Sequence, residues 1–282
     1  MLTLTQQDFI RFQRFIYDCA GITLADNKLV LVSSRLASRV QQCGLPTFSD
    51  YFRLLASGTE PQEVQTAIDL LTTNETYFFR EPKHFEFLRE QILATAGQSR
   101  SRPFRVWSAA GSTGEEAYSI GMVLEDCLRG RPWEVLASDI STRVLERARA
   151  GVFPLDRARN IPLAYLRRFC LQGQGKLERT LLVERGLRNK VRFQQINLNA
   201  PLPHIGDFDI VFLRNVLIYF NLETKRGVVE RVLRVVKPGG WLLIGHSENL
   251  HNVTEEVQAS APAIYQKPSE PVRFTRDAKT GT

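Results

Sequence analysis

The sequence predicts an α/β protein whose mostly parallel β-sheet is covered by helices on both faces, joined to a small all-α N-terminal domain. From about residue 104 onward, apolar strand-like runs alternate with helical patterns, whereas residues 1–72 carry helical periodicity and no convincing strand. A glycine-bearing loop between the first strand and the following helix is typical of a nucleoside-binding α/β unit.

The N-terminal domain is predicted as a group of short amphipathic helices. Thr5 can cap the first helix, and Gly21 follows it. The segment 27–42 has an apolar stripe at helical spacing, made of Leu29, Val32, Leu36 and Val40. Shorter helices are expected at 48–56 and 62–71.

Three basic residues of segment 27–42 lie about 80–90° around the helix from its apolar stripe: Lys28, Arg35 and Arg39. They form either a solvated rim or a docking edge for an acidic surface. The formal charge of +7 favours an acidic partner, but charge alone does not choose among nucleic acid, a membrane surface and an acidic protein.

Composition narrows the class of protein. A chain of 282 residues with 43% hydrophobic content suits a core domain with a smaller partner domain, and no apolar run approaches the roughly 20 residues of a membrane span. The first residues lack signal-peptide features, so a cytoplasmic protein is expected. The four cysteines form no Cys-x-x-Cys pair and the four histidines lack metal-ligand spacing, so no metal is expected.

The sheet domain is expected to alternate strands and helices with short connections. The strand candidates are 104–109, 134–138, 190–196, 208–213, 240–245 and 262–266, and the helices between them are 115–128, 141–150 and 222–236. Lys237–Gly240 is expected as a tight turn. The last strand follows without a long helix, which predicts an antiparallel edge strand, as in the seven-stranded methyltransferase sheet rather than a dehydrogenase.

Two segments depart from this alternation. Residues 168–190 contain Gly173-Gln174-Gly175 and a later apolar run, which predicts a small hairpin inserted in the sheet domain. The polar residues 269–282 are expected to form a disordered tail.

The loop from Gly111 to Gly114 contains the most informative chemistry. It lacks the third glycine of Gly-x-Gly-x-x-Gly, and Glu115 and Glu116 follow it, where they would repel a pyrophosphate at the helix N-terminus. Asp139 ends the next strand, where a carboxylate suits ribose hydroxyls. A cationic nucleoside without phosphate, S-adenosylmethionine, fits this pattern better than NAD.

Three further segments add polar groups near predicted strand ends or ahead of the sheet. Asn74–Arg80 crowds polar side chains beside aromatic ones, Arg214-Asn215 ends a buried strand, and Gly245–Glu248 follows another. In the first of these a helix cap with a core aromatic cluster is the structural alternative, but it explains Arg80 poorly.

Together these segments resemble the CheR-type chemoreceptor glutamate methyltransferases. The resemblance covers about residues 1–268 and rests on several motifs in the same order: Asn74-x-Thr76-x-Phe78-Phe79-Arg80, Ser112-Thr113-Gly114-Glu115-Glu116, Ala137-Ser138-Asp139-Ile140, Asn197-Leu198, Arg214-Asn215-Val216-x-Ile218-Tyr219-Phe220 and Gly245-His246-Ser247-Glu248.

The resemblance implies a Rossmann-like class I methyltransferase sheet with an inserted small antiparallel β-subdomain, plus a small all-α N-terminal domain. The implied divisions are a helical domain at 1–72, a linker helix carrying the Asn74–Arg80 motif at 73–90, and the methyltransferase domain at 91–268. It also implies cofactor contacts from Asn74, Thr76, Arg80, Glu116, Asp139, Asn197, Leu198, Arg214 and Asn215.

The implied reaction transfers the methyl group of S-adenosylmethionine to receptor glutamates, giving glutamate methyl esters and S-adenosylhomocysteine. A glutamate is already ionised near neutrality, so the enzyme mainly orients the reactants. Arg80 and Tyr219 are the expected catalytic residues, positioning the incoming carboxylate by charge and a phenolic hydrogen bond. The alternatives are that Tyr219 is a core aromatic and that Arg80 holds the carboxylate of the cofactor. For two of the cofactor residues the structural alternatives are a helix cap at Asp139 and a turn residue at Asn197.

The expected partner is the cytoplasmic helical region of chemoreceptors, bound by a monomer through Lys28, Arg35 and Arg39. In some relatives the β-subdomain also captures a C-terminal receptor pentapeptide, and the glycine turn at 173–175 resembles theirs. An RNA methyltransferase is disfavoured because no RNA-binding module or interleaved exposed aromatics accompany the basic helix. A non-enzymatic adaptor is disfavoured because Arg80, Asp139, Asn215 and Tyr219 are all present.

Overall fold

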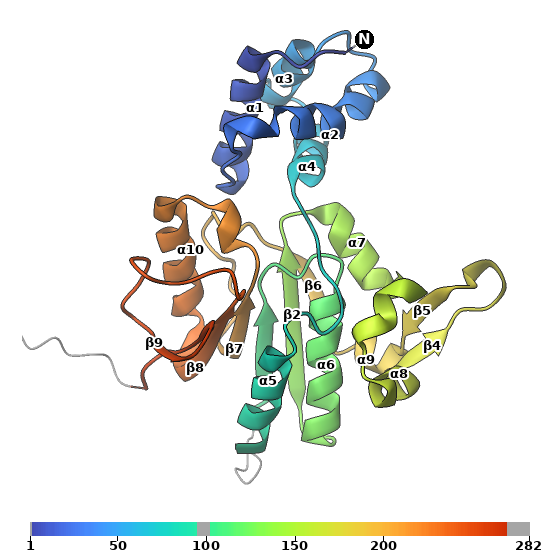
Figure 1. Cartoon of the computed structure of the whole chain (residues 1–282), viewed down its shortest axis with the longest axis vertical. Helices are drawn as coiled ribbons and strands as arrows, with labels where there is room; N and C mark the ends of the chain where they lie inside the picture. Colours follow the sequence, from blue (N-terminus) through green and yellow to red (C-terminus); the bar gives the residue numbers. More distant parts are fainter. Residues whose placement is uncertain (1, 95–101, 270–282) are drawn as a thin grey trace, which may run out of the picture.

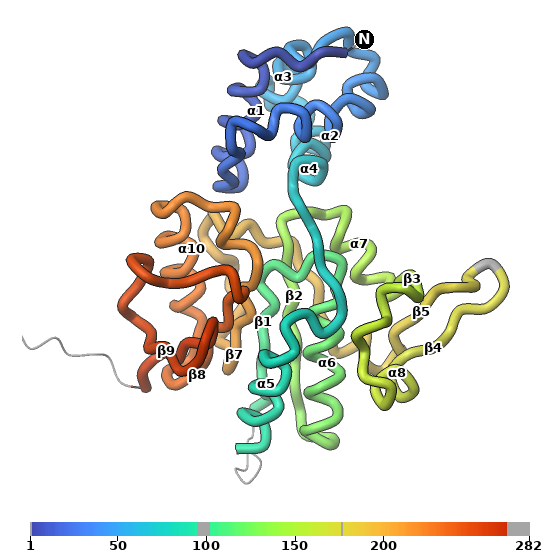
Figure 2. The backbone as a smooth tube through the Cα atoms, viewed as in Figure 1, coloured from blue at the N-terminus to red at the C-terminus, as the bar shows by residue number. Residues whose placement is uncertain are grey.

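The computed structural model describes residues 2–94 and 102–269. A group of four helices stands over one edge of an α/β domain, and a small β-subdomain projects from the side of that domain (Figures 1 and 2). The predicted fold class is confirmed. No helix in the described part of the chain combines the length and the apolar character needed to cross a bilayer.

The N-terminal domain consists of α1 (Gln6–Ala20), α2 (Leu29–Gln42), α3 (Phe48–Ala56) and α4 (Pro61–Leu71), with a 3-10 turn, η1 (Asp26–Lys28), ahead of α2. Thr5 and Thr47 cap α1 and α3 by accepting backbone N–H groups. Helix α2 starts two residues later than expected, so Lys28 lies on η1. The apolar stripe of α2 packs into a core with aromatic side chains from α1 and α3, namely Phe9, Phe12, Phe48 and Tyr51.

The large sheet has seven strands in the order β6-β2-β1-β7-β8-β10-β9. They are β1 (Phe104–Ser108), β2 (Trp133–Asp139), β6 (Val191–Gln195), β7 (Phe208–Leu213), β8 (Val236–Ile244), β9 (Gln258–Ala261) and β10 (Ile264–Gln266). The pairs among β6, β2, β1, β7 and β8 are parallel, and β10 is antiparallel to both its neighbours. The predicted antiparallel orientation of the last strand is therefore correct, but its edge position is wrong, because β9 pairs with its outer side.

Helices cover both faces of this sheet. Alternate strand residues point to opposite sides, so Val106 packs with α5 (Lys83–Ala94) and α6 (Glu115–Leu128), while Trp107 packs with α10 (Leu222–Arg234). Helix α7 (Thr142–Ala150) connects β2 to the subdomain, and the short α9 (Arg185–Arg188) precedes β6. The two cores lie on opposite faces of the sheet and hold in place the strand ends that form the site described below.

The inserted subdomain is larger than the predicted hairpin at 168–190. It is a three-stranded antiparallel sheet in the order β3-β5-β4, formed by β3 (Val152–Pro154), β4 (Cys170–Gln172) and β5 (Thr180–Val183). The turn η2 (Leu155–Asn160) and helix α8 (Leu163–Phe169) connect β3 to β4, and η3 (Gly175–Leu177) lies in the β4–β5 turn. The third strand, β3, was missed because it lies ahead of the predicted segment, with η2 and α8 between it and β4.

Two other expectations require correction, and a third is not tested. The Asn74–Arg80 motif lies in extended backbone and a turn, because helix α5 begins only at Lys83. Lys237–Gly240 is the start of β8 rather than a separate turn, with an irregular register opposite β7 and a left-handed φ of +75° at Gly239. Of the tail predicted at 269–282, residues 270–282 lie outside the described residues.

Candidate active site at the carboxyl edge of the sheet

A cavity of about 650 Å³ lies between the N-terminal domain and the carboxyl edge of the parallel strands. Residues that follow β1, β2, β6 and β7 line it. Strand β1 pairs with β2 on one side and with β7 on the other, so the chain order reverses at this place. Ligands of open α/β sheets bind at such a switch point.

All the residues expected to contact the cofactor line this one cavity. They are Asn74, Thr76, Arg80, Glu116, Asp139, Asn197, Leu198, Arg214 and Asn215. Tyr219, Lys28 and Arg35 line it as well, whereas Arg39 does not. The structure thus brings these residues together from distant parts of the sequence, and Arg39 is the one predicted site residue that lies outside the cavity.

The glycine loop is fixed between β2 and the linker. Gly114 has a φ of +97°, and a Cβ there would lie 2.9 Å from the Cβ of Ala148, so only glycine fits this start of α6. The hydroxyl of Ser112 donates to the backbone oxygen of Asn74 at 2.9 Å. This contact ties the Asn74–Arg80 linker to the loop, so the two motifs form one wall of the cavity.

Asp139 organises the loop from the end of β2. Its two carboxylate oxygens accept the backbone N–H groups of Ser112 at 3.0 Å and Ser141 at 2.9 Å. Burial raises the pKa of Asp139 to about 6, although these hydrogen bonds oppose the shift. Each oxygen keeps a second lone pair for a ligand hydroxyl.

The two acids after the loop have different partners. Glu116 accepts from the Ser108 hydroxyl at 2.7 Å and from Arg214 at 2.9 Å, and burial raises its pKa. Glu115 is buried away from the cavity, where it pairs with Arg157 at 3.0 Å. Arginines therefore compensate both charges, so the sequence argument that two unpaired acids repel a phosphate is incomplete.

Arg214 is the centre of a buried network at the end of β7. Its side chain is 1% exposed and pairs with Glu116 and with Glu81, each at 2.9 Å. It also donates to the backbone oxygen of Arg80 at 2.5 Å. Glu81 was not singled out from the sequence, and its position directly after Arg80 is the one signal that could have suggested it.

Glu248 holds the turn that follows Arg214. Its carboxylate accepts backbone N–H groups from Asn215 at 2.9 Å, Gly245 at 2.6 Å and Ile218 at 3.2 Å. These bonds hold Asn215 at a φ of +56°, a left-handed conformation that asparagine adopts more readily than most residues with a side chain. Burial raises the pKa of Glu248. The carboxyl group positions η4 (Leu217–Tyr219), the turn that carries Tyr219.

Arg80 and Tyr219 keep polar groups free at the cavity. The Arg80 guanidinium donates to the backbone oxygen of Glu75 at 3.0 Å and lies 5.8 Å from the Tyr77 ring centre. Among the described residues no carboxylate pairs with Arg80, and no side chain bonds the Tyr219 hydroxyl. A cation and a hydroxyl without such partners suit a carboxylate ligand.

The N-terminal domain closes the cavity from above. Asp69 at the end of α4 accepts the backbone N–H of Thr142 at 3.0 Å and that of Arg143 at 3.2 Å, which caps α7 across the domain boundary. Gly21, at the end of α1, lies so close to α10 that a Cβ there would be 2.7 Å from the side chain of Thr224. Beside Gly21, the Asn197 side chain also holds the end of α1 by donating to the backbone oxygen of Cys19 at 2.7 Å.

The three basic residues expected to dock substrate have different environments. Lys28 is exposed at the cavity mouth. At the end of α4, Arg35 donates to the backbone oxygen of Leu71 at 2.7 Å and to that of Thr72 at 3.1 Å. Arg39 forms a short ion pair with the buried Glu63 inside the N-terminal domain. Arg39 therefore has an internal structural role that its helical position could not reveal.

The family models and the curated relatives show which family the chain belongs to. Residues 74–265 match the family described as "CheR methyltransferase, SAM binding domain", and residues 7–72 match "CheR methyltransferase, all-alpha domain". The chemotaxis protein methyltransferase of Escherichia coli (strain K12) is 41% identical over 267 residues, which is 94% of this chain and 92% of that protein. Chemotaxis protein methyltransferase 2 of Pseudomonas aeruginosa is 41% identical, covering 93% of both chains. The crystal structure of the glycopeptide N-methyltransferase MtfA with S-adenosyl-L-methionine has a TM-score of 0.34 and 20% identity, covering 57% of this chain and 53% of that one.

Proposed function

This chain belongs to the CheR family of S-adenosylmethionine-dependent methyltransferases, and from that premise we propose that it esterifies glutamate side chains on the cytoplasmic helices of chemoreceptors. The products are glutamate methyl esters and S-adenosylhomocysteine. The observation that carries the proposal is the convergence of the motif residues on one cavity where, among the described residues, no carboxylate pairs with Arg80 and no side chain bonds the Tyr219 hydroxyl.

The cavity supplies partners for several parts of the cofactor. Asp139 accepts the ribose hydroxyls through its second lone pairs. Asn197 and Asn215, which follow β6 and β7, each contribute the amide N–H that their bonds to Cys19 and Glu81 leave over. Glu116 faces the positive part of the ligand. A volume of about 650 Å³ is in the range of small-molecule sites.

The chemistry is a direct displacement at the methyl carbon. A carboxylate oxygen of the substrate glutamate forms the new C–O bond while the C–S bond breaks, and the bonding electron pair returns to the sulfonium sulfur. No proton is transferred, because a glutamate with a pKa of about 4.3 is already ionised near neutrality. Arg80 and Tyr219 hold the incoming carboxylate in line with the methyl–sulfur bond, and the N-terminal domain excludes water.

The substrate helix approaches the cavity mouth beside Lys28. Exposed apolar side chains of α2 and η4 surround this mouth, with Leu31 36% exposed and Ile218 51% exposed. A glutamate-rich helix presents negative charge to Lys28 and apolar side chains to these two residues. Arg35 contributes positive potential from within the cavity wall, whereas Arg39 acts through the fold of the domain.

We also propose that a receptor peptide binds at the β-subdomain. Strands β3 and β4 are both edge strands of their sheet, and Leu171 on β4 is 55% exposed. A C-terminal aromatic-rich pentapeptide can add a strand there and raise the local enzyme concentration near the methylation helices. Calorimetric titration with such a peptide should give heat at submillimolar concentration. A silent titration would leave receptor recognition to the N-terminal domain.

The experiment that tests the function is methyl transfer to receptor-containing membranes from labelled S-adenosylmethionine. We expect label in the receptor that base releases, as from a carboxylate ester. Label in RNA, or none at all, would instead support another methyltransferase or an adaptor.

Substitutions separate binding from chemistry. Arg80→Ala and Tyr219→Phe should lower turnover by more than they lower cofactor affinity, because both groups position the substrate. Tyr265→Phe on β10, away from the cavity, is the matched control. Equal losses of affinity and turnover would make Arg80 and Tyr219 contacts of the cofactor itself.

A further inference from the structure

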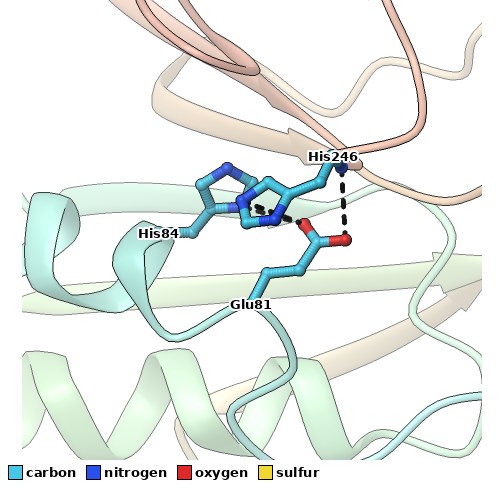
Figure 3. Close-up of side chains that lie close together, drawn as sticks. All are labelled: Glu81, His84 and His246. Atoms are coloured by element: carbon cyan, nitrogen blue, oxygen red, sulfur yellow. Dashed lines mark hydrogen bonds and ion pairs between the residues drawn. The ribbon is translucent and has the colours of Figure 1, made fainter.

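We propose that Glu81, His84 and His246 form a binding site for a divalent transition-metal ion of the Zn²⁺ class, beside the cofactor cavity and separate from it. One carboxylate oxygen and two imidazole nitrogens, one from each residue, all lie within 4.8 Å of one another. Figure 3 shows the two imidazole rings and the carboxylate gathered at one place. The inference is independent of the substrate proposed above.

The residues come from two distant segments of the chain. Glu81 and His84 lie three positions apart around the start of α5, and His246 follows the end of β8. The Nδ1 atom of His84 lies 3.4 Å from Glu81 Oε2, and the Nε2 atom of His246 lies 3.9 Å from that oxygen. No spacing rule could have found this set, because its third member is far away in sequence.

The state of His84 points to a ligand. Its side chain is 0% exposed, and within residues 2–94 and 102–269 neither ring nitrogen has a hydrogen-bond partner. A buried polar group without a partner costs free energy, typically about 1–3 kcal/mol. A metal bond to one nitrogen would satisfy this group, and a free imidazole lone pair is what a transition metal requires.

The distances suit a tetrahedral ion after a small movement. With metal–ligand bonds of about 2.0–2.1 Å, tetrahedral ligand atoms lie about 3.3 Å apart. The pair formed by His84 and Glu81 already meets this separation, whereas His246 must move closer. The His246 side chain is 47% exposed, so it can move without repacking a core. Its exposure also leaves a fourth position open to water.

The neighbouring charges permit a cation despite the proximity of Arg214. Glu81 and Glu116 both pair with this guanidinium, and the Glu248 carboxyl group lies on the adjoining turn. Two carboxylates therefore pair directly with one arginine. Two imidazoles and one carboxylate favour Zn²⁺ and similar ions over Mg²⁺ or Ca²⁺, which prefer oxygen ligands.

The site does not overlap the cofactor. None of the three residues lines the cavity, although Glu81 contacts Arg214, which does. A metal and S-adenosylhomocysteine can thus bind at the same time.

Calorimetric titration of the full chain with Zn²⁺ alone, with and without saturating S-adenosylhomocysteine, tests the proposal. We expect one site in both conditions. His246→Ala should weaken it by more than about 10-fold, since even changes outside the first coordination sphere commonly cost that much. His251→Ala, another exposed histidine, is the matched control and should bind as the wild type does.

Co²⁺ spectra identify the ligands independently. We expect the weak bands of nitrogen and oxygen ligation that disappear in His246→Ala, whereas a thiolate charge-transfer band would assign binding to the cysteines and overturn the proposal. Unchanged Zn²⁺ affinity in His246→Ala, or displacement of Zn²⁺ by S-adenosylhomocysteine, would overturn it as well. Because His246 is exposed, these outcomes do not depend on whether a substitution of the buried His84 folds.

Discussion

Replacing Asp139 by asparagine should separate cofactor binding from folding. Burial raises the pKa of Asp139 from 3.8 to about 6, a difference that corresponds to about 3 kcal/mol. Between these two values the folded protein binds more protons than the unfolded chain. The contribution of Asp139 to stability is therefore complete below about pH 4 and is lost as the pH rises through 6.

Asp139→Asn changes stability in two opposing directions at neutral pH. It removes the cost of about 3 kcal/mol for keeping a buried carboxylate ionised. It also leaves one of the two backbone N–H groups, of Ser112 or Ser141, facing an amide N–H, which costs about 1–3 kcal/mol. The two effects nearly cancel, so the variant should unfold at a denaturant concentration close to that of the wild type.

Cofactor affinity should fall much more than stability does. Hydrogen bonds to charged groups exceed neutral ones by about 1 kcal/mol each, so two ribose hydroxyls lose about 2 kcal/mol, or about 30-fold in affinity. The wild type should also bind about tenfold more weakly at pH 5 than at pH 8, because Asp139 is mostly protonated below pH 6. In Asp139→Asn this pH dependence should shrink.

Calorimetry with S-adenosylhomocysteine from pH 5 to pH 8 measures both effects. Asp69, whose charge raises the Asp139 pKa, and Glu116 in the cavity wall are unchanged in the variant, so any titration they contribute persists there. Unchanged affinity in a folded Asp139→Asn protein would refute the ribose assignment. So would a pH dependence equal to that of the wild type.

Three further predictions concern the elements around the cavity. Lys28→Glu should raise the apparent KM for receptor without changing cofactor affinity, and it should reduce the inhibition by added salt. Arg39→Glu should instead lower the free energy of unfolding by about 1–3 kcal/mol, because Glu63 loses its partner. Normal receptor kinetics in Lys28→Glu would make Lys28 part of a solvated rim. Asp69→Ala should lower the free energy of unfolding in urea by about 1–3 kcal/mol, because it removes the cap of α7, and a neutral result would mean that the domain contact is weak. Glu248→Gln should lower cofactor affinity through Asn215 while Asn249→Ala does not, and equal affinities of the two would remove Glu248 from the set of positioning residues.

Much of the fold could be predicted because local patterns carry it. Helix α6 spans 115–128 as expected, since its glycine start and apolar spacing are both local. The central strands are apolar runs buried on both faces, which also makes them visible. Strand β9 was missed because its residues, Gln258–Ala261, are exposed and carry no apolar alternation. This segment forms a strand because it pairs with β10, and its own residues do not indicate that pairing.

The site was predictable where function depends on strand ends and not where it depends on pairing across the fold. Asp139 and Arg214 end apolar runs, and parallel strands bring those ends together. The pairing of Arg39 with Glu63 joins two helices whose relative orientation no sequence pattern reports. The same is true of Glu115 with Arg157 and of the contact between Glu81 and His246.

A crystal structure of the protein with S-adenosylhomocysteine bound tests the central claim most directly. We expect the product in the cavity of about 650 Å³ at the ends of β1, β2, β6 and β7, with its ribose hydroxyls within hydrogen-bond distance of the Asp139 carboxylate. Its sulfur should face the mouth where Arg80, Tyr219 and Lys28 lie. A product bound elsewhere, or a ribose held by residues other than Asp139, would show that this cavity is not the cofactor site proposed here.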